Sequence, residues 1–258
     1  MKAPIFYYHS VGGPPPQTLA LPQFQQHLEA IRSNAYRTVT VAELLEAGRD
    51  LPSRCVALAF DDGLLDNYTQ VFPLLLQYGM RATFYVVPGY DRVTRWVSPR
   101  TGRWSDVPAP GFTIPFENMG TAHRRELARH GMEIGSHSLT HRMLTRVSGE
   151  ELIREVRDSK DVIEQELGTS VKTFCYPRGR FAPVVLRAVR EAGYLGACST
   201  LPGYYRAELP RYVLPRFLVE DPDYFRAVLL SKAFRPRALL RLARRRLLAR
   251  DSFVRRGP

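Results

Sequence analysis

Two short segments of this chain carry the residue types of a metal site. The first is the acidic pair Asp61-Asp62, and the second, about 75 residues later, is the histidine pair His137 and His141. Two imidazoles four residues apart can reach one cation from a single turn, a carboxylate supplies a third ligand, and a further position stays open for water or substrate. The other carboxylate of the acidic pair can then take a proton from the bound water. The sequence therefore predicts metal-assisted hydrolysis.

These residues follow strand-like runs in a chain where strands and helices alternate, as they do in parallel α/β units. Strands are predicted over residues 4–8, 37–41, 55–60, 82–87, 132–135, 172–176, 195–199 and 212–219, and helices near 22–33, 66–78, 121–130, 149–166 and 183–192. Active sites of parallel barrels gather at the carboxyl ends of the strands. The residues expected at that rim are His9, Asp61, Asp62, His137, His141 and Pro177. We therefore expect a distorted (β/α) barrel as one catalytic domain, residues 1–231, followed by a basic helical tail, residues 232–258.

Four segments resemble the polysaccharide deacetylase superfamily, carbohydrate esterase family 4, with its NodB-type homology domain. They are residues 60–63, 137–141, 174–181 and 214–217, and the resemblance spans roughly residues 3–220. It implies that Asp61 is the general base and that Asp62, His137 and His141 hold a divalent metal, often zinc. It also implies that a backbone N–H of the turn formed by Tyr176, Pro177 and Arg178 donates to the oxyanion, with the Arg178 N–H as first choice.

The chain departs from the family pattern at the proton donor. No histidine follows His141, although the family usually carries one near the end of the domain. The opening segment, residues 6–12, resembles the deacetylases of exported poly-N-acetylglucosamine, in which the histidine matching His9 is the general acid. With an ordinary pKa near 6.5, a histidine can hold and release a proton at working pH. The alternative is a structural histidine at the end of an aromatic-rich strand.

A second departure concerns the partner of the base. Cys175 stands where the family usually has an arginine that orients the catalytic aspartate. Either Arg216 or Arg180 could compensate. Arg216 is favoured because it sits at the end of a predicted strand, in the Leu-Pro-Arg segment, but it could equally cap a loop.

The segment from 88 to 121 is predicted to be a long loop, and such loops in compact domains are usually functional. It contains Trp96 and Trp104. Their rings could stack on sugar faces or simply anchor the loop.

The positive charge is concentrated in the tail. Residues 232–258 hold ten Lys or Arg and one acid, whereas residues 1–231 hold 27 bases and 24 acids. Residues 238–250 form an amphipathic helical pattern, with leucines on one side and arginines on the other. Such a helix either lies on an anionic membrane surface or packs on the barrel with a solvated basic face. Nucleic acid is disfavoured because aromatic residues that could stack on bases are scarce there.

The start of the chain lacks the pattern of a signal peptide, and no uncharged run approaches the ~18 residues of a spanning helix. These features predict a cytoplasmic protein, at the inner face of the membrane if the tail binds it. The three cysteines are odd in number, widely spaced and set in apolar runs, so we expect them to be reduced and buried.

The expected activity is metal-dependent removal of an N-acetyl group from an amino sugar, in a glycan or a lipid-linked glycan precursor, with release of acetate. One divalent metal is expected, zinc first, although a His, His and Asp set also accepts cobalt, nickel, iron or manganese. The alternatives are a deformylase or amidase of a small non-sugar amide, and an inactive homologue that binds glycan or membrane.

Overall fold

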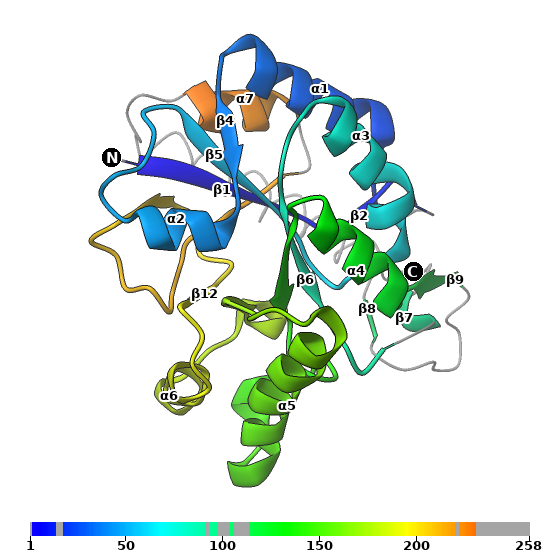
Figure 1. The fold of residues 1–258 in the computed structure, drawn as a ribbon, viewed down its shortest axis with the longest axis vertical. Coiled ribbons are helices and arrows are strands. Elements are labelled where there is room, and N and C mark those ends of the chain that lie inside the picture. The colour runs from blue at the N-terminus through cyan, green and yellow to red at the C-terminus, as the bar shows by residue number, and fades with distance from the viewer. Residues whose placement is uncertain are drawn as a thin grey trace, which may run out of the picture.

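The structure is a computed structural model that describes residues 2–13, 18–90, 93–97, 104–105, 114–219 and 222–230. For residues 93–97, 104–105 and 114–115 it describes the course of the backbone alone. A curled sheet lies at the centre of the molecule, and helices surround it (Figure 1). The predicted tail, residues 232–258, lies outside the described residues.

The large sheet is almost entirely parallel. Its strands are β1 (Lys2–Tyr8), β4 (Arg37–Val39), β5 (Cys55–Phe60), β6 (Thr83–Val86), β10 (Glu133–Ser136), β11 (Thr173–Cys175), β12 (Gly196–Cys198), β13 (Tyr204–Arg206) and β14 (Phe217–Leu218). Their order is β12-β11-β10-β6-β5-β1-β13, with β4 beside β5 and β14 beside β1, and the β1–β13 pair alone among them is antiparallel. A parallel bridge from Cys198 to Leu214 joins β12 to the segment that enters β14, so the curled sheet returns to β1. This confirms the predicted distorted barrel.

The helices cover the outside of this sheet. They are α1 (Leu21–Ser33), α2 (Val41–Ala47), α3 (Phe72–Gln77), α4 (Thr121–Arg129), α5 (Gly149–Leu167), α6 (Pro183–Glu191) and α7 (Pro222–Leu230), and a π-helical turn, Asn67–Val71, leads into α3. Helices α1 and α7 lie side by side (Figure 1). None of the helices in the described ranges has both the length and the apolar character needed to cross a bilayer.

Helix α2 is absent from the sequence-based prediction because seven residues are too few to establish a helical period. It begins instead at a capping box. Thr40 Oγ1 accepts from the Glu43 N–H at 3.2 Å, and Glu43 Oε2 accepts from the Thr40 N–H at 2.8 Å.

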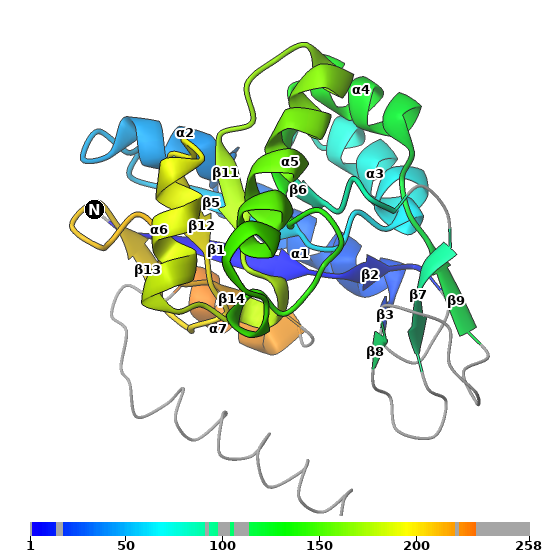
Figure 2. The same cartoon turned by 90° about the horizontal axis from the view of Figure 1, so that it is seen from below.

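Two small sheets stand beside the barrel. One pairs β2 (Ser10–Val11) with β3 (Thr18–Leu19), and the other has the order β8-β7-β9, formed by Trp104–Ser105, Val93–Val97 and Ile114–Glu117. The second lies within the segment predicted as a long loop, and Figure 2 shows it to one side of the barrel. Trp96 lies in β7 and Trp104 in β8, but their side chains are outside what the structure describes.

Alternation along the strands separates two cores, because successive side chains point to opposite faces of a sheet. On β5, Val56, Leu58 and Phe60 belong to the outer core beneath the helices. Cys55, Ala57 and Ala59 belong to the inner core of the barrel. Asp61 continues the inner phase of β5, and His9 continues that of Ile5 and Tyr7 on β1. The period of the strands therefore directs these side chains toward the mouth of the barrel.

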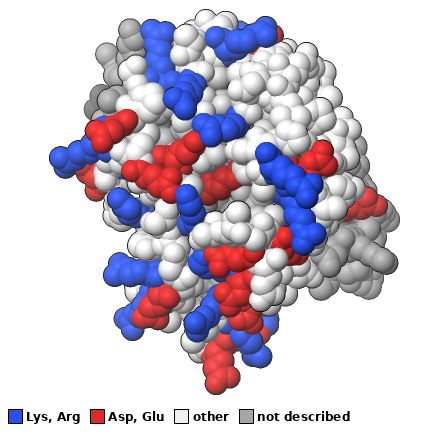
Figure 3. Space-filling view, viewed as in Figure 1, with Lys and Arg blue, Asp and Glu red and all other residues white. Residues whose placement is uncertain are grey.

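The cysteines and the charges agree with the sequence-based expectations. Cys55, Cys175 and Cys198 are free and buried. On the face shown in Figure 3, acidic and basic side chains are interspersed over the described part of the chain. This mixture matches the near balance of charge in residues 1–231.

Candidate active site

Asp62, His137 and His141 converge at the carboxyl ends of β5 and β10. The Asp62 Oδ1 atom lies 3.5 Å from Nε2 of His137 and 3.4 Å from Nε2 of His141. All three side chains are buried, and their ligand atoms lie within 4.8 Å of one another. The two imidazole rings stand 4.9 Å apart between centroids, inclined by 63°.

The donor set fits a divalent cation. Nδ1 of His137 lies 2.7 Å from the Cys175 carbonyl oxygen, which can only accept, so Nδ1 carries the proton. With Nδ1 used in this way, Nε2 of His137 is the ring atom that faces the Asp62 carboxylate, at 3.5 Å, and a cation bound between the two could take both as ligands. A backbone carbonyl that fixes the tautomer of a ligating histidine is the usual support of such a site.

The backbone at this site adopts left-handed conformations that residues other than glycine rarely take. Among the described residues, five that are not glycine have positive φ, and four of them are at the site: Asp62 (78°), Ser138 (65°), His141 (57°) and Arg178 (58°). Such angles cost free energy and persist only when the surroundings impose them. Gly63 follows with φ 64°, and a Cβ there would lie 3.1 Å from the Val86 Cα, so both the backbone angle and the close approach of Val86 favour glycine after Asp62.

Side chains of other elements hold the loop that carries the two histidines, residues 137–141, in this conformation. Glu155 of α5 is buried, and its carboxylate accepts from both the N–H and the hydroxyl of Thr140. The His141 N–H donates to Ser138 Oγ at 3.0 Å, and Tyr90 donates to the Thr140 carbonyl at 2.6 Å. Because these bonds lie between and beside the two histidines, they fix the separation of the rings.

Asp61 forms a bidentate ion pair with Arg216. Nη1 and Nη2 of the guanidinium donate to Oδ1 and Oδ2 at 2.7 and 2.8 Å, and both side chains are buried. Burial raises the pKa of Asp61, but the charge and hydrogen bonds of Arg216, with smaller contributions from His137 and His9, outweigh burial and hold this pKa below its ordinary value. Asp61 is therefore an ionised carboxylate at neutral pH. The other arginine considered from the sequence, Arg180, is exposed.

The position of Arg216 is fixed by three further contacts. Its Nε donates to the Ser199 carbonyl at 2.9 Å, and its guanidinium lies 4.3 Å from the centroid of the Tyr7 ring. Nη2 also lies 3.1 Å from the sulfur of Cys175. Arg216, which directly precedes β14, is thus held with its guanidinium beside Asp61.

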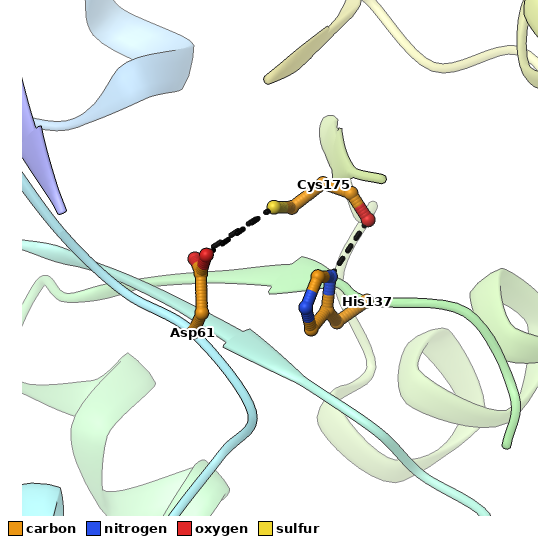
Figure 4. A group of neighbouring side chains, drawn as sticks. All are labelled: Asp61, His137 and Cys175. Carbon is orange, nitrogen blue, oxygen red and sulfur yellow. Dashed lines mark hydrogen bonds between the residues drawn. The ribbon is translucent and has the colours of Figure 1, made fainter. Parts of the chain in front are cut away.

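Cys175 contacts both halves of the site (Figure 4). Its sulfur lies 3.7 Å from each carboxylate oxygen of Asp61, and its carbonyl binds His137. Asp61, His137 and Cys175 also satisfy the distances of a metal group. However, burial raises the pKa of the Cys175 thiol well above its ordinary value, and Arg216 occupies both oxygens of Asp61. The set of Asp62, His137 and His141 is therefore the better ligand set, because metal binding requires deprotonated donors.

His9 directly follows β1 and is half-buried. It lies close enough to Asp61 for its charge to lower the pKa of that carboxyl group, and its ring is 5.8 Å from the ring of Tyr7. The Asp61 N–H donates to the Tyr8 carbonyl at 2.9 Å, so the residue before His9 is tied to Asp61.

The turn after β11 stands beside Cys175. Pro177–Gly179 form a 3-10 turn, closed by a bond from the Gly179 N–H to the Tyr176 carbonyl at 2.8 Å. Tyr176 and Pro177 are buried, whereas the side chain of Arg178 is exposed. The structure thus brings the predicted turn, acidic pair, histidine pair, His9 and Arg216 to one end of the barrel.

Several residues that support these groups were not predicted from the sequence. Glu155 and Ser159 lie in the buried stripe of α5 with Leu152, Val156 and Ile163. An acid within an apolar helical stripe is a readable signal, because an acidic side chain is rarely buried unless it is paired. Asn118, whose Nδ2 donates to the Asp62 carbonyl at 2.6 Å, carries no such signal because it lies in the segment predicted as loop.

Asp66, near the same end of the barrel, provides a prediction about stability. Burial raises the pKa of Asp66 to about 6, although hydrogen bonds from Ser10, Val11 and Asn67 oppose the shift. Because this pKa exceeds that of an unfolded aspartate, ~3.9, the folded state binds the proton more tightly. This stabilisation is complete below the unfolded pKa and is lost as pH rises through about 6.

Asp66→Asn removes the titration. Relative to the wild type, the variant should gain on the order of 2 kcal/mol in free energy of unfolding between pH 4 and pH 7. Urea denaturation of both proteins at several pH values measures this change. A stability difference that stays constant with pH would contradict it.

Comparisons with known proteins bear on the family and the fold. A family model described as "Polysaccharide deacetylase" matches residues 48–197. The Bacillus subtilis (strain 168) protein YxkH, named for the same family, is 28% identical over 222 residues, covering 84% of this chain and 71% of that protein. The poly-beta-1,6-N-acetyl-D-glucosamine N-deacetylase of Staphylococcus aureus (strain N315) is 23% identical over 217 residues, covering 78% of this chain and 68% of that protein. The structure of the Streptococcus pyogenes deacetylase PplD, solved with acetate, superposes with a TM-score of 0.73 at 22% identity, covering 86% of this chain and 96% of that one.

Proposed function

Because this chain belongs to the polysaccharide deacetylase family, we propose that it hydrolyses the N-acetyl group of an amino sugar in a glycan, releasing acetate, with the help of one divalent metal. The observation that supports this most is the position of an ionised, arginine-paired carboxylate, Asp61, next to a second carboxylate that faces two imidazoles. Two adjacent carboxylates in different surroundings suit two different roles.

Asp62, His137 and His141 would hold the metal, zinc first, with cobalt, nickel, iron or manganese as alternatives. A divalent cation there supplies Lewis-acid polarisation of the acetamide carbonyl and lowers the pKa of a water molecule. Nε2 would be the coordinating atom of His137, because Nδ1–H donates to the Cys175 carbonyl.

Asp61 is the general base of the proposed reaction. It takes a proton from the attacking water as the oxygen bonds to the amide carbon. Arg216 keeps Asp61 ionised and holds both oxygens of the carboxylate in one orientation. The burial of the pair strengthens these interactions, because water does not screen them.

His9 is the general acid, and the turn after β11 stabilises the oxyanion. Collapse of the tetrahedral intermediate breaks the C–N bond, and the departing sugar amine takes a proton from the His9 ring. The backbone N–H of Arg178, beside Tyr176 and Pro177, donates to the developing oxyanion. The left-handed conformation of Arg178 supports this role, since the chain holds an unfavourable backbone angle at that residue.

For the substrate, we propose an amino-sugar polymer or its lipid-linked precursor. The name of the Staphylococcus aureus relative supports poly-N-acetylglucosamine as the class. The ten Lys or Arg in residues 232–258 support contact with an anionic membrane surface. Failure of the full chain to cosediment with anionic vesicles would exclude such contact.

Acetate release from a panel of substrates tests the proposed function. The panel contains N-acetylglucosamine oligomers, a lipid-linked N-acetyl sugar and a simple aryl acetamide, each assayed with metal-stripped and metal-loaded protein. Metal-dependent release from the sugars alone is expected. Release only from the aryl acetamide would favour an amidase of small compounds, and bound metal without any release would exclude N-acetyl sugars of these kinds as substrates.

Removal of one metal ligand should weaken metal binding strongly while the protein remains folded. His141→Ala leaves two of the three ligands, and we expect its affinity for Zn²⁺ to fall more than about 100-fold, since loss of a supporting hydrogen bond alone costs 10–100-fold. Metal content after dialysis measures this loss. His130→Ala, at an exposed histidine of α4's C-terminus, is the matched control and should bind metal like the wild type. Equal metal content in the two variants would remove His141 from the ligand set.

A further inference from the structure

Two consecutive side chains bind the three consecutive residues that begin with His9. Asn67 Nδ2 donates to the His9 carbonyl at 2.9 Å. Asp66 accepts from Ser10 Oγ at 2.7 Å and from the Val11 N–H at 3.2 Å. Asp66 and Asn67, together called the 66–67 clamp, thus connect the turn before α3 to the segment that leaves β1.

The two members of the 66–67 clamp also fix each other. Asn67 Nδ2 donates to Asp66 Oδ1 at 2.7 Å as well as to the His9 carbonyl. Both acceptors lack protons, so a rotated amide would place its oxygen against two oxygens. Asn67 is fully buried, and its own Oδ1 atom has no hydrogen-bond partner among the described residues. The amide therefore acts through its donors.

The 66–67 clamp continues the pairing of β1 with β5 beyond the ends of both strands. The last strand pair joins Tyr8 to Phe60, and the Asp61 N–H then donates to the Tyr8 carbonyl. The next carbonyl, that of His9, lies beyond the last pair of β1 with β5 and is bound by Asn67. Beyond His9, Ser10 and Val11 form β2, which pairs with β3, and the Gly12 N–H donates to the Leu19 carbonyl at 2.9 Å. The backbone of His9 is thus held on both sides relative to Asp61.

We propose that Asp66 and Asn67 are positioning residues for His9, which hold its imidazole beside Asp61 where it can protonate the departing amine. This inference rests on the proposed function, in which His9 is the general acid. Neither residue touches the substrate in this role. Their effect should be confined to reactions whose leaving group needs a proton.

Two substrates separate this role from a general loss of structure. An N-acetylglucosamine oligomer releases an amine, which must be protonated, whereas 4-nitrophenyl acetate releases a phenolate that departs without a proton. Asn67→Leu removes the donors and the unpaired oxygen while keeping the number and branching of the side-chain heavy atoms. We expect it to lower kcat on the oligomer about 10- to 100-fold, the range for a misplaced catalytic group, with KM and the rate on the ester changed less than about twofold.

Two further variants provide a weaker change at the same site and a control at a distant one. Asp66→Asn keeps an acceptor for Val11 and should give a smaller loss of the same kind. Asn34→Leu is the matched control, because Asn34 also donates its side-chain amide to a backbone carbonyl, that of Ala30, at the end of α1. It should leave both rates unchanged.

The outcomes distinguish the inference from the proposed function. His9→Ala should lose activity on the oligomer and keep it on the ester. If it does and Asn67→Leu loses both rates equally, or neither, the positioning role is wrong while the acid role stands. If His9→Ala itself shows no difference between the substrates, the acid role fails and the positioning role falls with it.

A measurement without turnover gives a second criterion. In the full chain carrying ¹³C-labelled histidine rings, Asn67→Leu should broaden or split the His9 resonance and leave those of His123 and His130 unchanged. A single, unshifted His9 resonance would overturn the proposal, whatever the rates.

Discussion

Asp61→Asn should lower kcat for acetate release about 1000-fold while the protein keeps its metal. Loss of a general base costs typically 10²–10⁴-fold, and asparagine cannot take up the proton of water. The ligands Asp62, His137 and His141 are unchanged, so metal content should equal that of the wild type. Initial rates, with metal measured on the same samples, provide the test.

The control for this variant must account for stability. Asparagine leaves Arg216 buried with one acceptor instead of two, so Asp61→Asn should also unfold at a lower temperature. Rates should therefore be taken well below that transition. Asp50→Asn, at an exposed acid at the other end of the barrel, should change neither rate nor metal. More than a tenth of the wild-type rate in a fully loaded Asp61→Asn protein would show that another group is the base.

The part of the site that could be predicted from the sequence is the part fixed by strand period and local spacing. Asp61 continues the inner phase of β5, and His137 directly follows β10. These relations need no knowledge of distant segments. The strand limits of β5 were predicted to the residue because its run of apolar residues is unbroken.

The remaining parts depend on contacts between distant segments. Arg216 lies 155 residues from Asp61 in the sequence, and the residues around each of them do not predict that the two side chains pair. The strand predicted over 212–219 is shorter in the structure, where β14 contains Phe217 and Leu218 alone. Residues 211–213 form a turn, and Leu214 makes a single bridge to Cys198 where the barrel closes. The sheet of β7, β8 and β9 was predicted as loop, since strands of two to five residues are too short to establish a period.

Arg216→Met should destabilise the protein by about 3–5 kcal/mol, the usual cost of leaving a buried charge without its partner. The folded-state pKa of Asp61 lies below its ordinary value, so the pair stabilises the protein fully above the unfolded pKa and loses this effect as pH falls from that value through the lower folded-state pKa. The variant and the wild type should therefore differ most at neutral pH and converge in acid. Denaturation curves of both proteins at pH 7 and pH 3.5 test whether the difference in free energy of unfolding is larger at pH 7.

Arg124→Met is the matched control for Arg216→Met. Arg124 is as deeply buried as Arg216 and pairs with Glu166 between α4 and α5, away from Asp61. It should cost stability without changing kcat, whereas Arg216→Met should lower kcat about 100-fold at pH 7. Equal kcat values for the two variants, measured well below their unfolding temperatures, would show that Asp61 needs no arginine.

The double variant Asp61→Asn, Arg216→Met decides whether the two residues act as one unit. Each single change leaves a buried polar group with too few partners, but the double change removes both charges at once. Its loss of stability should therefore be smaller than the sum of the single losses by roughly 2 kcal/mol, a coupling typical of residues in direct contact. In kcat, the double variant should be no worse than Asp61→Asn alone, because an arginine that acts only through Asp61 has no further effect once the base is gone. Losses that multiply would instead assign Arg216 a contact with the substrate of its own.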